Sequence, residues 1–189
     1  MARTIITTAV AIVAGLALAA SAQAQLTVTQ DARGDSAKDV DMKKVTVDHT
    51  RKRVRLKTKM YRGNGLPDEV WHVVDTQGDA VPEFIVFTVV TSEVTDKPSV
   101  RVVRVDGWPR RRDPYDRLHD GDAVSCGLHL GRRKPAERLL TVVIGRGCLR
   151  TDGEMPQRLR VSSFGTFEWG KITDKVPAWR EYGRWVTAD

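Results

Sequence analysis

Two apolar runs constrain the fold more than any other feature of the chain. They read W-H-V-V and F-I-V-F-T-V-V, at residues 71–74 and 84–90, with the acidic turn D-T-Q-G-D-A-V-P-E between them. Both runs are apolar at odd and at even positions, as is typical of strands that are covered on both faces. We therefore predict two buried central strands, with Asp75 and Asp79 brought together at one end of the sheet by a turn at Gly78.

Alternating patterns predict further strands around this pair. Residues 51–61, R-K-R-V-R-L-K-T-K-M-Y, alternate between basic and mostly apolar side chains, which indicates a half-exposed strand. With few helical signals and regular turns, the chain is predicted to be all-β: one antiparallel β-sandwich domain over residues 25–189, with about eight or nine strands. The other predicted strands span residues 40–47, 99–105, 123–130, 138–144, 158–163 and 167–172.

Three segments are expected to lie outside the strands. Residues 25–38 are polar and rich in small side chains, so we expect a loose start to the domain. Residues 107–121 contain W-P-R-R-R-D-P-Y-D-R and are predicted to form a loop. The sequence G-R-R-K-P-A-E, at residues 131–137, is predicted to be a turn.

The first 24 residues match a signal peptide. Arg3 supplies a positive charge, an apolar run extends from Ala9 to Ala20, and Ala22-Gln23-Ala24 fits the small-x-small cleavage rule. We expect cleavage after Ala24. No later stretch approaches the roughly 20 apolar residues of a transmembrane helix, so the mature domain is expected to be secreted, without a transmembrane segment.

The cysteine content predicts one disulfide. Cys126 and Cys148 are the only cysteines of the chain, and exported proteins fold in an oxidising compartment. A plain hairpin of the two flanking strands would not place the sulfur atoms opposite each other. We therefore expect either that Cys148 lies in a loop that folds back, or that the bridge joins two sheets.

The balance of charge is basic. The chain carries 31 Lys and Arg against 24 Asp and Glu, a formal net charge of +7. Such a charge suits anionic partners, such as wall polymers or lipid headgroups; nucleic acid would also fit the charge, but we do not expect it. Basic residues on strand edges also protect against aggregation, so the charge alone does not identify a partner.

Two groups of acidic residues suggest calcium sites. Calcium takes six to eight oxygen ligands, and loops of exported β-sandwiches can bring such oxygens together. The alternative is that Asp and Gly only form turns and the carboxylates stay solvated. The first group comprises Asp31, Asp35, Asp39 and Asp41, and the second comprises Asp75, Asp79 and Glu83.

Exposed aromatic side chains could bind sugar rings. Trp108 and Tyr115 lie in the arginine-rich loop, where they could form a stacking platform for a sugar or an anionic polymer. In the alternative interpretation, Trp108 caps one end of the sandwich and the arginines are solvated. The arginines of this loop are Arg110, Arg111 and Arg112.

The sequence contains no recognised catalytic arrangement. Its four histidines are scattered, and G-x-S-x-G, H-E-x-x-H and Cys-His patterns are absent. His72 lies inside an apolar strand, where we expect a buried core histidine. Asp75 and Glu83 could be the two carboxylates of a polysaccharide hydrolase, although almost any acidic turn would offer such a pair.

Two longer motifs resemble a known group of β-sandwiches. The segments D-A-R-G-D-S-A-K-D-V-D-M-K-K-V-T-V-D-H and V-W-H-V-V-D-T-Q-G-D-A-V-P-E-F are similar to exported actinobacterial proteins related to carbohydrate-binding family 9 and DOMON-like domains. The resemblance implies a jelly-roll sandwich that binds ligands through its loops. The haem-ligand pattern of haem-binding DOMON domains is absent, so no redox role is expected. Asp31, Asp35 and Asp39 match the opening motif, and Asp75 and Asp79 match the strand-end motif.

Taken together, these patterns predict a secreted, non-enzymatic binding or surface-interaction module. A wall polysaccharide or another anionic polymer is the expected partner. Two alternatives stay open: a polysaccharide hydrolase that uses Asp75 and Glu83, and an electrostatic binder of anionic polymers that uses Arg110, Arg111 and Arg112.

Overall fold

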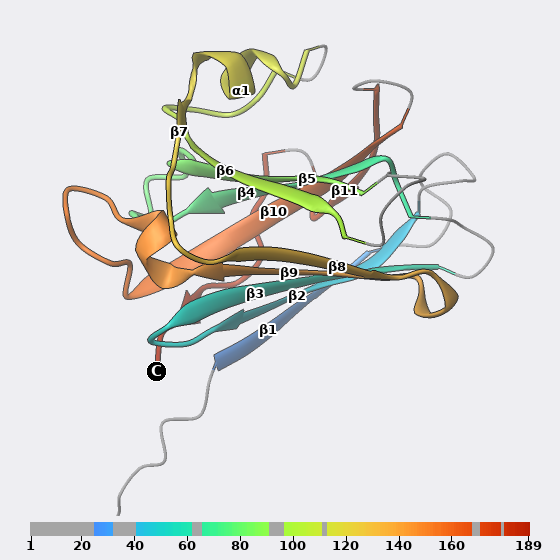
Figure 1. Ribbon diagram of the computed structural model, residues 1–189, viewed down its shortest axis with the longest axis horizontal. Coiled ribbons are helices and arrows are strands. Elements are labelled where there is room, and N and C mark those ends of the chain that lie inside the picture. Colours follow the sequence, from blue (N-terminus) through green and yellow to red (C-terminus); the bar gives the residue numbers. More distant parts are fainter. Residues whose placement is uncertain are drawn as a thin grey trace, which may run out of the picture.

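The fold was analysed in a computed structural model of the chain (Figure 1). The structure describes residues 25–31, 41–61, 66–90, 97–110, 113–167, 171–178 and 180–189. The predicted signal peptide, residues 1–24, lies outside them.

Two antiparallel sheets are stacked face to face (Figure 1). The first sheet has five strands in the order β1-β2-β3-β9-β8. Its β3 forms hydrogen-bonded ladders with β2 on one side and β9 on the other, so β3 is the central strand. The bounds are β1 Gln25–Gln30, β2 Met42–His49, β3 Arg53–Met60, β9 Leu139–Gly145 and β8 His129–Lys134.

The second sheet has seven strands, in the order β11-β10-β4-β5-β6-β7, with the short β12 also paired to β10. Three short helical turns complete the described elements: α1 Asp116–Asp120, η1 Pro135–Glu137 and η2 Arg146–Leu149. The strand bounds are β11 Lys171–Val176, β10 Arg158–Phe167, β4 Glu69–Asp75, β5 Phe84–Val89, β6 Ser99–Arg104, β7 Asp122–Ala123 and β12 Val186–Thr187.

The main core lies between the two sheets. Alternation in β3 explains how one strand serves both core and solvent: Val54, Leu56 and Met60 are buried, while the basic residues between them point away from the other sheet. Side chains of β2 and β9 add to the same layer, and Phe84 and Val86 meet them from the second sheet. The predicted all-β antiparallel sandwich is confirmed.

A second apolar layer covers the outer face of the seven-stranded sheet. All seven residues of β4 are buried, and Trp71 is completely inaccessible to solvent. Its ring lies 4.6 Å from that of Phe87 and 5.3 Å from that of Phe164. The segment that contains α1 lies over this face of the sheet (Figure 1) and its side chains pack on these rings, which explains why the two central strands are apolar on both faces.

The predicted disulfide joins Cys126 to Cys148, with the Cα atoms 5.3 Å apart. Cys148 lies in η2, the turn that follows β9, which confirms the expectation of a loop that folds back. Cys126 lies between β7 of one sheet and β8 of the other, so the bridge fixes the point where the chain crosses between the sheets.

Several predicted boundaries were wrong. Residues 25–30, expected to be loose, form β1, which pairs with β2 along its whole length although Leu26 and Val28 are exposed. The predicted strand over residues 123–130 ends at Ala123 as β7, and a new strand begins at His129. The predicted turn over residues 131–137 is therefore mostly strand β8, and only Pro135–Glu137 turns.

Further differences are smaller. The segment expected to be entirely loop contains the one-turn helix α1. The strand predicted over residues 158–163 is longer than expected, because β10 continues to Phe167 through a register shift at Gly165. The strand predicted over residues 167–172 is shifted along the chain, because β11 begins at Lys171 and ends at Val176. A bulge of this kind breaks the alternation from which strand ends were predicted.

Removal of the disulfide should destabilise the fold. The two cysteines are 22 residues apart, so on the chain-entropy model the Cys126→Ala, Cys148→Ala variant should lose about 3 kcal/mol of unfolding free energy. Urea denaturation followed by circular dichroism measures this loss. A change below about 1 kcal/mol would contradict a structural role for the bridge.

Candidate functional site

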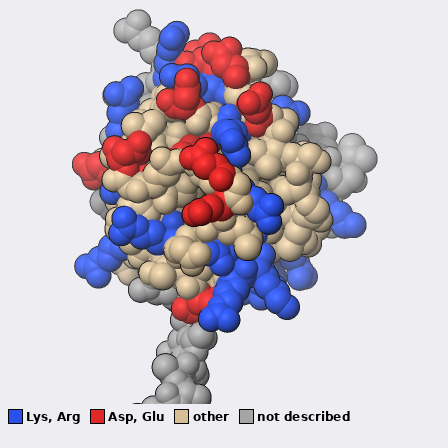
Figure 2. All heavy atoms as spheres, turned by 90° about the vertical axis from the view of Figure 1, so that its left-hand side faces the viewer, with Lys and Arg blue, Asp and Glu red and all other residues tan. Residues whose placement is uncertain are grey.

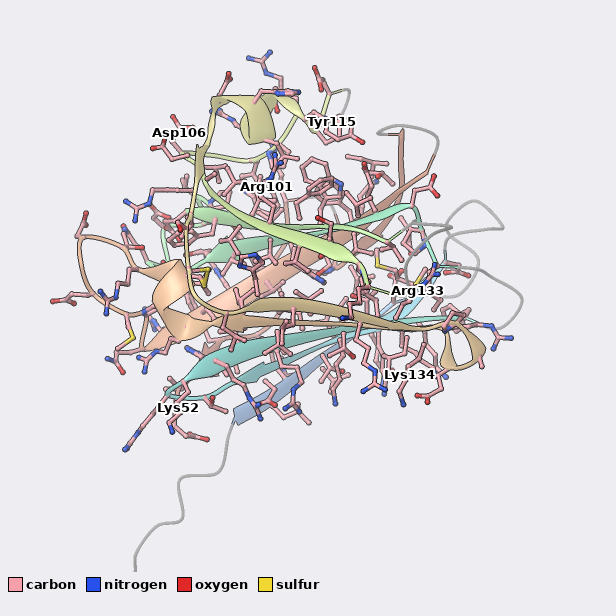
Figure 3. The ribbon with its side chains drawn as sticks, viewed as in Figure 1. Lys52, Arg101, Asp106, Tyr115, Arg133 and Lys134 are labelled. Atoms are coloured by element: carbon pink, nitrogen blue, oxygen red, sulfur yellow. A yellow bond between two sulfur atoms is a disulfide. The ribbon has the colours of Figure 1, made fainter. Side chains whose placement is uncertain are left out.

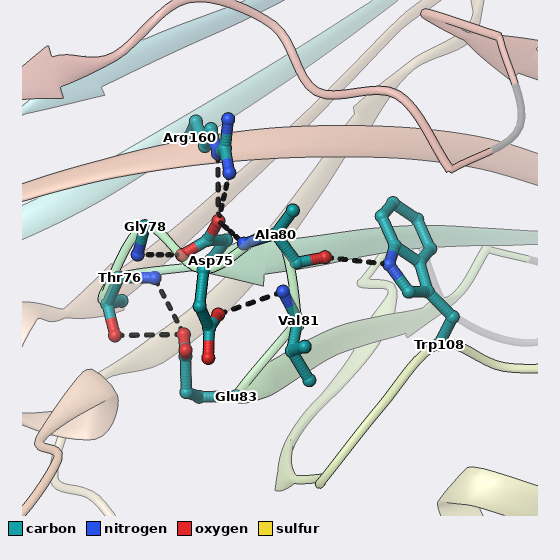
Figure 4. A network of polar contacts seen from close by, with 9 residues as sticks. Asp75, Thr76, Gly78, Ala80, Val81, Glu83, Trp108 and Arg160 are labelled. Carbon is teal, nitrogen blue, oxygen red and sulfur yellow. Dashed lines mark hydrogen bonds and ion pairs between the residues drawn. The ribbon is translucent and has the colours of Figure 1, made fainter.

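The turn between β4 and β5 is held by the carboxylate of Asp75 (Figure 4). This carboxylate accepts hydrogen bonds from the backbone N–H of Gly78, at 2.7 Å, and of Ala80, at 3.2 Å. Gly78 and Ala80 both have positive φ, at 99° and 67°, which is the backbone conformation that Gly adopts without strain. The hydrogen bonds to Asp75 therefore fix the shape of this tight turn.

Asp75 is also one half of a buried ion pair. Arg160 lies directly opposite it in the β4–β10 ladder, and its Nε and Nη2 donate to Asp75 Oδ2 at 2.8 and 2.7 Å. Asp75 is fully buried, while the Arg160 side chain is partly exposed. Because burial of an unpaired carboxylate is costly, the arginine is what permits an aspartate at this position.

The other two carboxylates of the turn also bind backbone. Glu83 Oε2 accepts from the N–H of Thr76 at 2.6 Å and from its hydroxyl at 3.0 Å, and Asp79 accepts from Val81 N–H at 2.9 Å. Burial raises the pKa of the Glu83 carboxyl above its usual value. Carboxylate oxygens of Asp75, Asp79 and Glu83 lie within 4.8 Å of one another, yet each residue already stabilises the turn. Calcium at Asp75 and Asp79 stays a prediction.

A second acidic cluster forms where β1, β2 and β11 meet. Asp31 follows β1, Asp41 precedes β2 and Asp174 lies on β11; their carboxylate oxygens lie within 4.8 Å of one another. Asp41 and Asp174 are buried, and the backbone N–H of Met42 donates to Asp174. The sequence analysis missed Asp174 because it is distant along the chain. The predicted ligands Asp35 and Asp39 lie outside the described residues.

Arginines and aromatic rings form a stack beneath the central turn. Arg160 lies between two rings of the tail, 4.7 Å from the centroid of Tyr182 and 4.8 Å from that of Trp185. Arg158 covers Trp185 at 4.4 Å, and Trp108 continues the stack 4.8 Å from Tyr182. These cation–π contacts anchor the tail to the turn that Asp75 holds.

The predicted stacking platform is not assembled as expected. Tyr115 is turned inward: its hydroxyl donates to Glu69 at 2.6 Å, and its ring packs on Trp71 and Phe87. Trp108 is half-buried, and its indole N–H donates to Ala80 O at 3.0 Å (Figure 4). Of the loop arginines, Arg110 is exposed and pairs with Asp116 at 3.1 Å, whereas Arg111 and Arg112 lie outside the described residues.

An open cleft of about 570 Å³ lies beside the central turn. One wall is the turn itself, at Thr76 and Gln77; the other is the hairpin that precedes β10. The hairpin turns at Asp152 and Gly153, which both have positive φ, as in a type I′ turn. The lining residues are Thr76, Gln77, Thr151, Asp152, Glu154, Met155, Pro156, Gln157 and Arg158.

Hydrogen bonds hold both walls of the cleft in place. The Thr76 hydroxyl lies 3.4 Å from that of Thr151, which links the two walls, and Arg146 Nε donates to Pro156 O at 2.8 Å. Arg146 is buried, and burial lowers the pKa of its guanidinium below the usual value. The cleft is therefore shaped by the fold before any ligand arrives.

The buried histidines are part of the core. His72 is fully buried on β4, and its Nδ1 lies 2.7 Å from the hydroxyl of Ser163. Burial lowers the pKa of His72 to about 3, so it is neutral at physiological pH. His49 is likewise buried, with Nδ1 at 3.2 Å from Val186 O. Neither ring reaches the cleft, so neither serves there as a base.

Comparisons of the chain with protein-family models, with curated proteins and with solved structures found no match. The likeness to carbohydrate-binding family 9 and DOMON-like domains therefore stays a prediction. Within the described residues, no helix is long and apolar enough to cross a membrane.

Loss of the Asp75 charge should be costly. In the Asp75→Asn variant the shape is kept but Arg160 loses its counter-charge, so we expect a loss of about 2–4 kcal/mol of unfolding free energy. Asp79→Asn removes a charge from the same turn at an exposed position and should cost less than about 0.5 kcal/mol. Chemical denaturation compares the two variants. Equal losses would contradict the role of Asp75 in holding the turn and pairing with Arg160.

Proposed function

We propose that the protein is an extracellular, non-enzymatic module that binds polysaccharide in the cleft between the central turn and the hairpin that precedes β10. The observation that supports this is the chemistry of the preformed cleft, which combines many hydrogen-bonding side chains with some apolar surface. Its volume lies within the range typical of small-ligand sites.

The lining side chains match the groups of a sugar ring. Carboxylates of Asp152 and Glu154 accept hydrogen bonds from hydroxyls, and the amides of Gln77 and Gln157 both donate and accept. A sugar hydroxyl also does both. Met155 is partly exposed and offers an apolar contact for the C–H faces of a ring.

The walls of the cleft are already ordered, which favours ligand binding. The hydrogen bonds that Gly78 donates to Asp75 and that Thr76 donates to Glu83 fix the turn, so a ligand would not have to order it. Ordering a loop on binding costs free energy that is subtracted from affinity. The acidic turn thus contributes to binding as a scaffold, and its neighbours Thr76 and Gln77 meet the ligand.

The hydrolase alternative is less well supported. Asp75 is fully buried and paired to Arg160, so its carboxylate does not face a substrate. Glu83 is held by Thr76 through two hydrogen bonds. A pair of glycosidase carboxylates must flank the scissile bond in an open cleft, which these two residues do not do.

The cleft can be tested by polysaccharide retention. We expect the mature protein to be retained on a wall or polysaccharide fraction, and the Gln77→Ala, Gln157→Ala variant to bind at least about tenfold more weakly. Gln30→Ala, on the distant β1, is the matched control and should bind as the wild type does. Absence of retention on every fraction, or unchanged binding by the double variant, would contradict the proposal.

We also propose that calcium occupies the cluster of Asp31, Asp41 and Asp174. The carboxylate oxygens of these three residues lie within 4.8 Å of one another, and Asp41 and Asp174 are buried. Oxygen ligands at the junction of three strands suit a hard cation. A calcium ion here would tie β1 to β2 and β11, and so stabilise the fold.

Calcium should therefore raise the melting temperature. At 10 mM Ca²⁺ and an affinity typical of extracellular modules, the expected shift is about 3 °C. Asp174→Asn keeps an acceptor for Met42 N–H and should abolish the shift, whereas Asp79→Asn at the other cluster should retain it. Differential scanning calorimetry measures both; no shift in the wild type would remove the proposal.

A further inference from the structure

The two sheets differ in what covers their outer faces. On the seven-stranded sheet, the α1 segment and Tyr182 form a second apolar layer. On the five-stranded sheet, no element of the described chain packs on the outer face, and Leu26 and Leu130 are 60% and 59% exposed there. This open surface carries basic side chains from β2, β3 and β8, and we call it the basic face. Its cations are Lys44, Arg53, Arg55, Lys57, Lys59, Arg132 and Lys134.

Strand register arranges most of these cations in two ridges. Arg53, Arg55, Lys57 and Lys59 occupy alternate positions of β3, which are about 6.8 Å apart along the strand. Arg132 and Lys134 do the same on β8, and Lys134 projects away from the second sheet in Figure 3. The ridges are two strands apart, or about 9.6 Å.

Between the ridges lies β9, whose outward side chains are uncharged. Thr141 is directly opposite Lys57 on one side and Arg132 on the other. Leu139 is likewise flanked by Lys59 and Lys134. The result is a neutral floor, the length of β9, with long basic side chains along both sides.

Folding alone does not account for this arrangement. Lys44 lies directly opposite Lys59, and like charges in that position destabilise a sheet. Basic side chains protect exposed edges from aggregation, which accounts for Arg132 and Lys134 on the edge strand β8 but not for the cations of β3, the central strand of its sheet. Among the described strands and turns of this face, only Asp48 and Glu137 offset the charge, through Arg55 and Lys134.

Charge is unevenly distributed on one side of the molecule. Figure 2 shows carboxylates over the upper and middle parts of this side, with Lys and Arg between them. Lys and Arg gather along the lower edge of the same view, toward the five-stranded sheet. An anionic partner would thus be attracted to the basic face.

We propose that the basic face binds a linear polymer that carries a phosphate in each repeat, with the polymer lying along β9 between the two ridges. The non-bridging oxygens of a phosphodiester point to opposite sides of the chain, so a phosphate over Thr141 can meet Lys57 on one ridge and Arg132 on the other. Arginine and lysine both bind phosphate well. This surface is separate from the cleft, and the inference does not depend on polysaccharide binding there.

A line of charge fits a polymer better than a membrane. Most of the cations follow the strand direction on either side of β9, so they form lines and do not spread over the whole face. Because each exposed ion pair contributes little, binding requires several phosphates in one chain and should weaken steeply with salt.

One substitution tests the placement on β9. Thr141→Glu puts a carboxylate between Lys57 and Arg132, so it should reduce binding of inorganic polyphosphate about tenfold or more while cross-strand pairing keeps the fold stable. Thr141→Gln has the same size without the charge and should bind as the wild type does. Isothermal titration calorimetry against a salt series measures binding, and thermal unfolding checks the fold.

A charge-matched pair of variants separates the basic face from net charge. Lys57→Gln with Arg132→Gln should reduce polyphosphate binding about tenfold. Arg101→Gln with Arg110→Gln removes the same charge on the far side of the sandwich, where Arg101 is labelled in Figure 3, and should have little effect. Gln77→Ala, Gln157→Ala should leave polyphosphate binding unchanged, whatever it does to polysaccharide binding.

Several results would overturn the proposal. They are absence of polyphosphate binding at low salt, equal binding by Thr141→Glu and Thr141→Gln, and equal losses in the two charge-matched variants. Binding to vesicles of mixed phosphatidylcholine and phosphatidylglycerol in place of the polymer would also overturn it, because it would identify a membrane-binding face. Orthophosphate at the same total phosphate concentration should bind much more weakly than the polymer.

Discussion

Burial of β4 on both faces is the constraint on which the rest of the structure depends. Its seven residues have no solvent-facing side, so a layer is needed above as well as below them. The five-stranded sheet supplies one layer, and the α1 segment with Tyr115 supplies the other. With both faces of the central pair used by the core, the pair itself meets other molecules only at its strand ends.

Charged residues take three different roles in this arrangement. At the end of β4, Asp75 and Arg160 neutralise each other and hold a turn, so a buried charge becomes part of the scaffold. At the junction of β1 and β11, the carboxylates of Asp31 and Asp174 converge, and we propose that a calcium ion binds there. On β3, cations stay solvated in a line, and we propose that a polymeric anion binds there. The same residue types thus differ in role according to burial and spacing.

Local periodicity predicted the strands but could not predict what lies across from them. The sequence indicated the apolar runs of β4 and β5 and the alternation of β3, because both patterns repeat within a few residues. Arg160 and Asp174 were missed because their partners depend on the pairing of distant strands. The cationic ridge of β8 was missed for another reason: G-R-R-K before a proline resembles a turn, and only pairing with β9 makes it a strand.

Native-state hydrogen exchange, resolved for individual amides, tests most directly the claim that β4 is sealed from both sides. If the account is correct, the amides of Val70 to Val74 exchange only when the whole domain unfolds, and they are among the slowest in the protein. Faster exchange of β4 amides than of β9 amides, through local opening under the α1 segment, would contradict it. In that case the second apolar layer would not be a stable part of the fold.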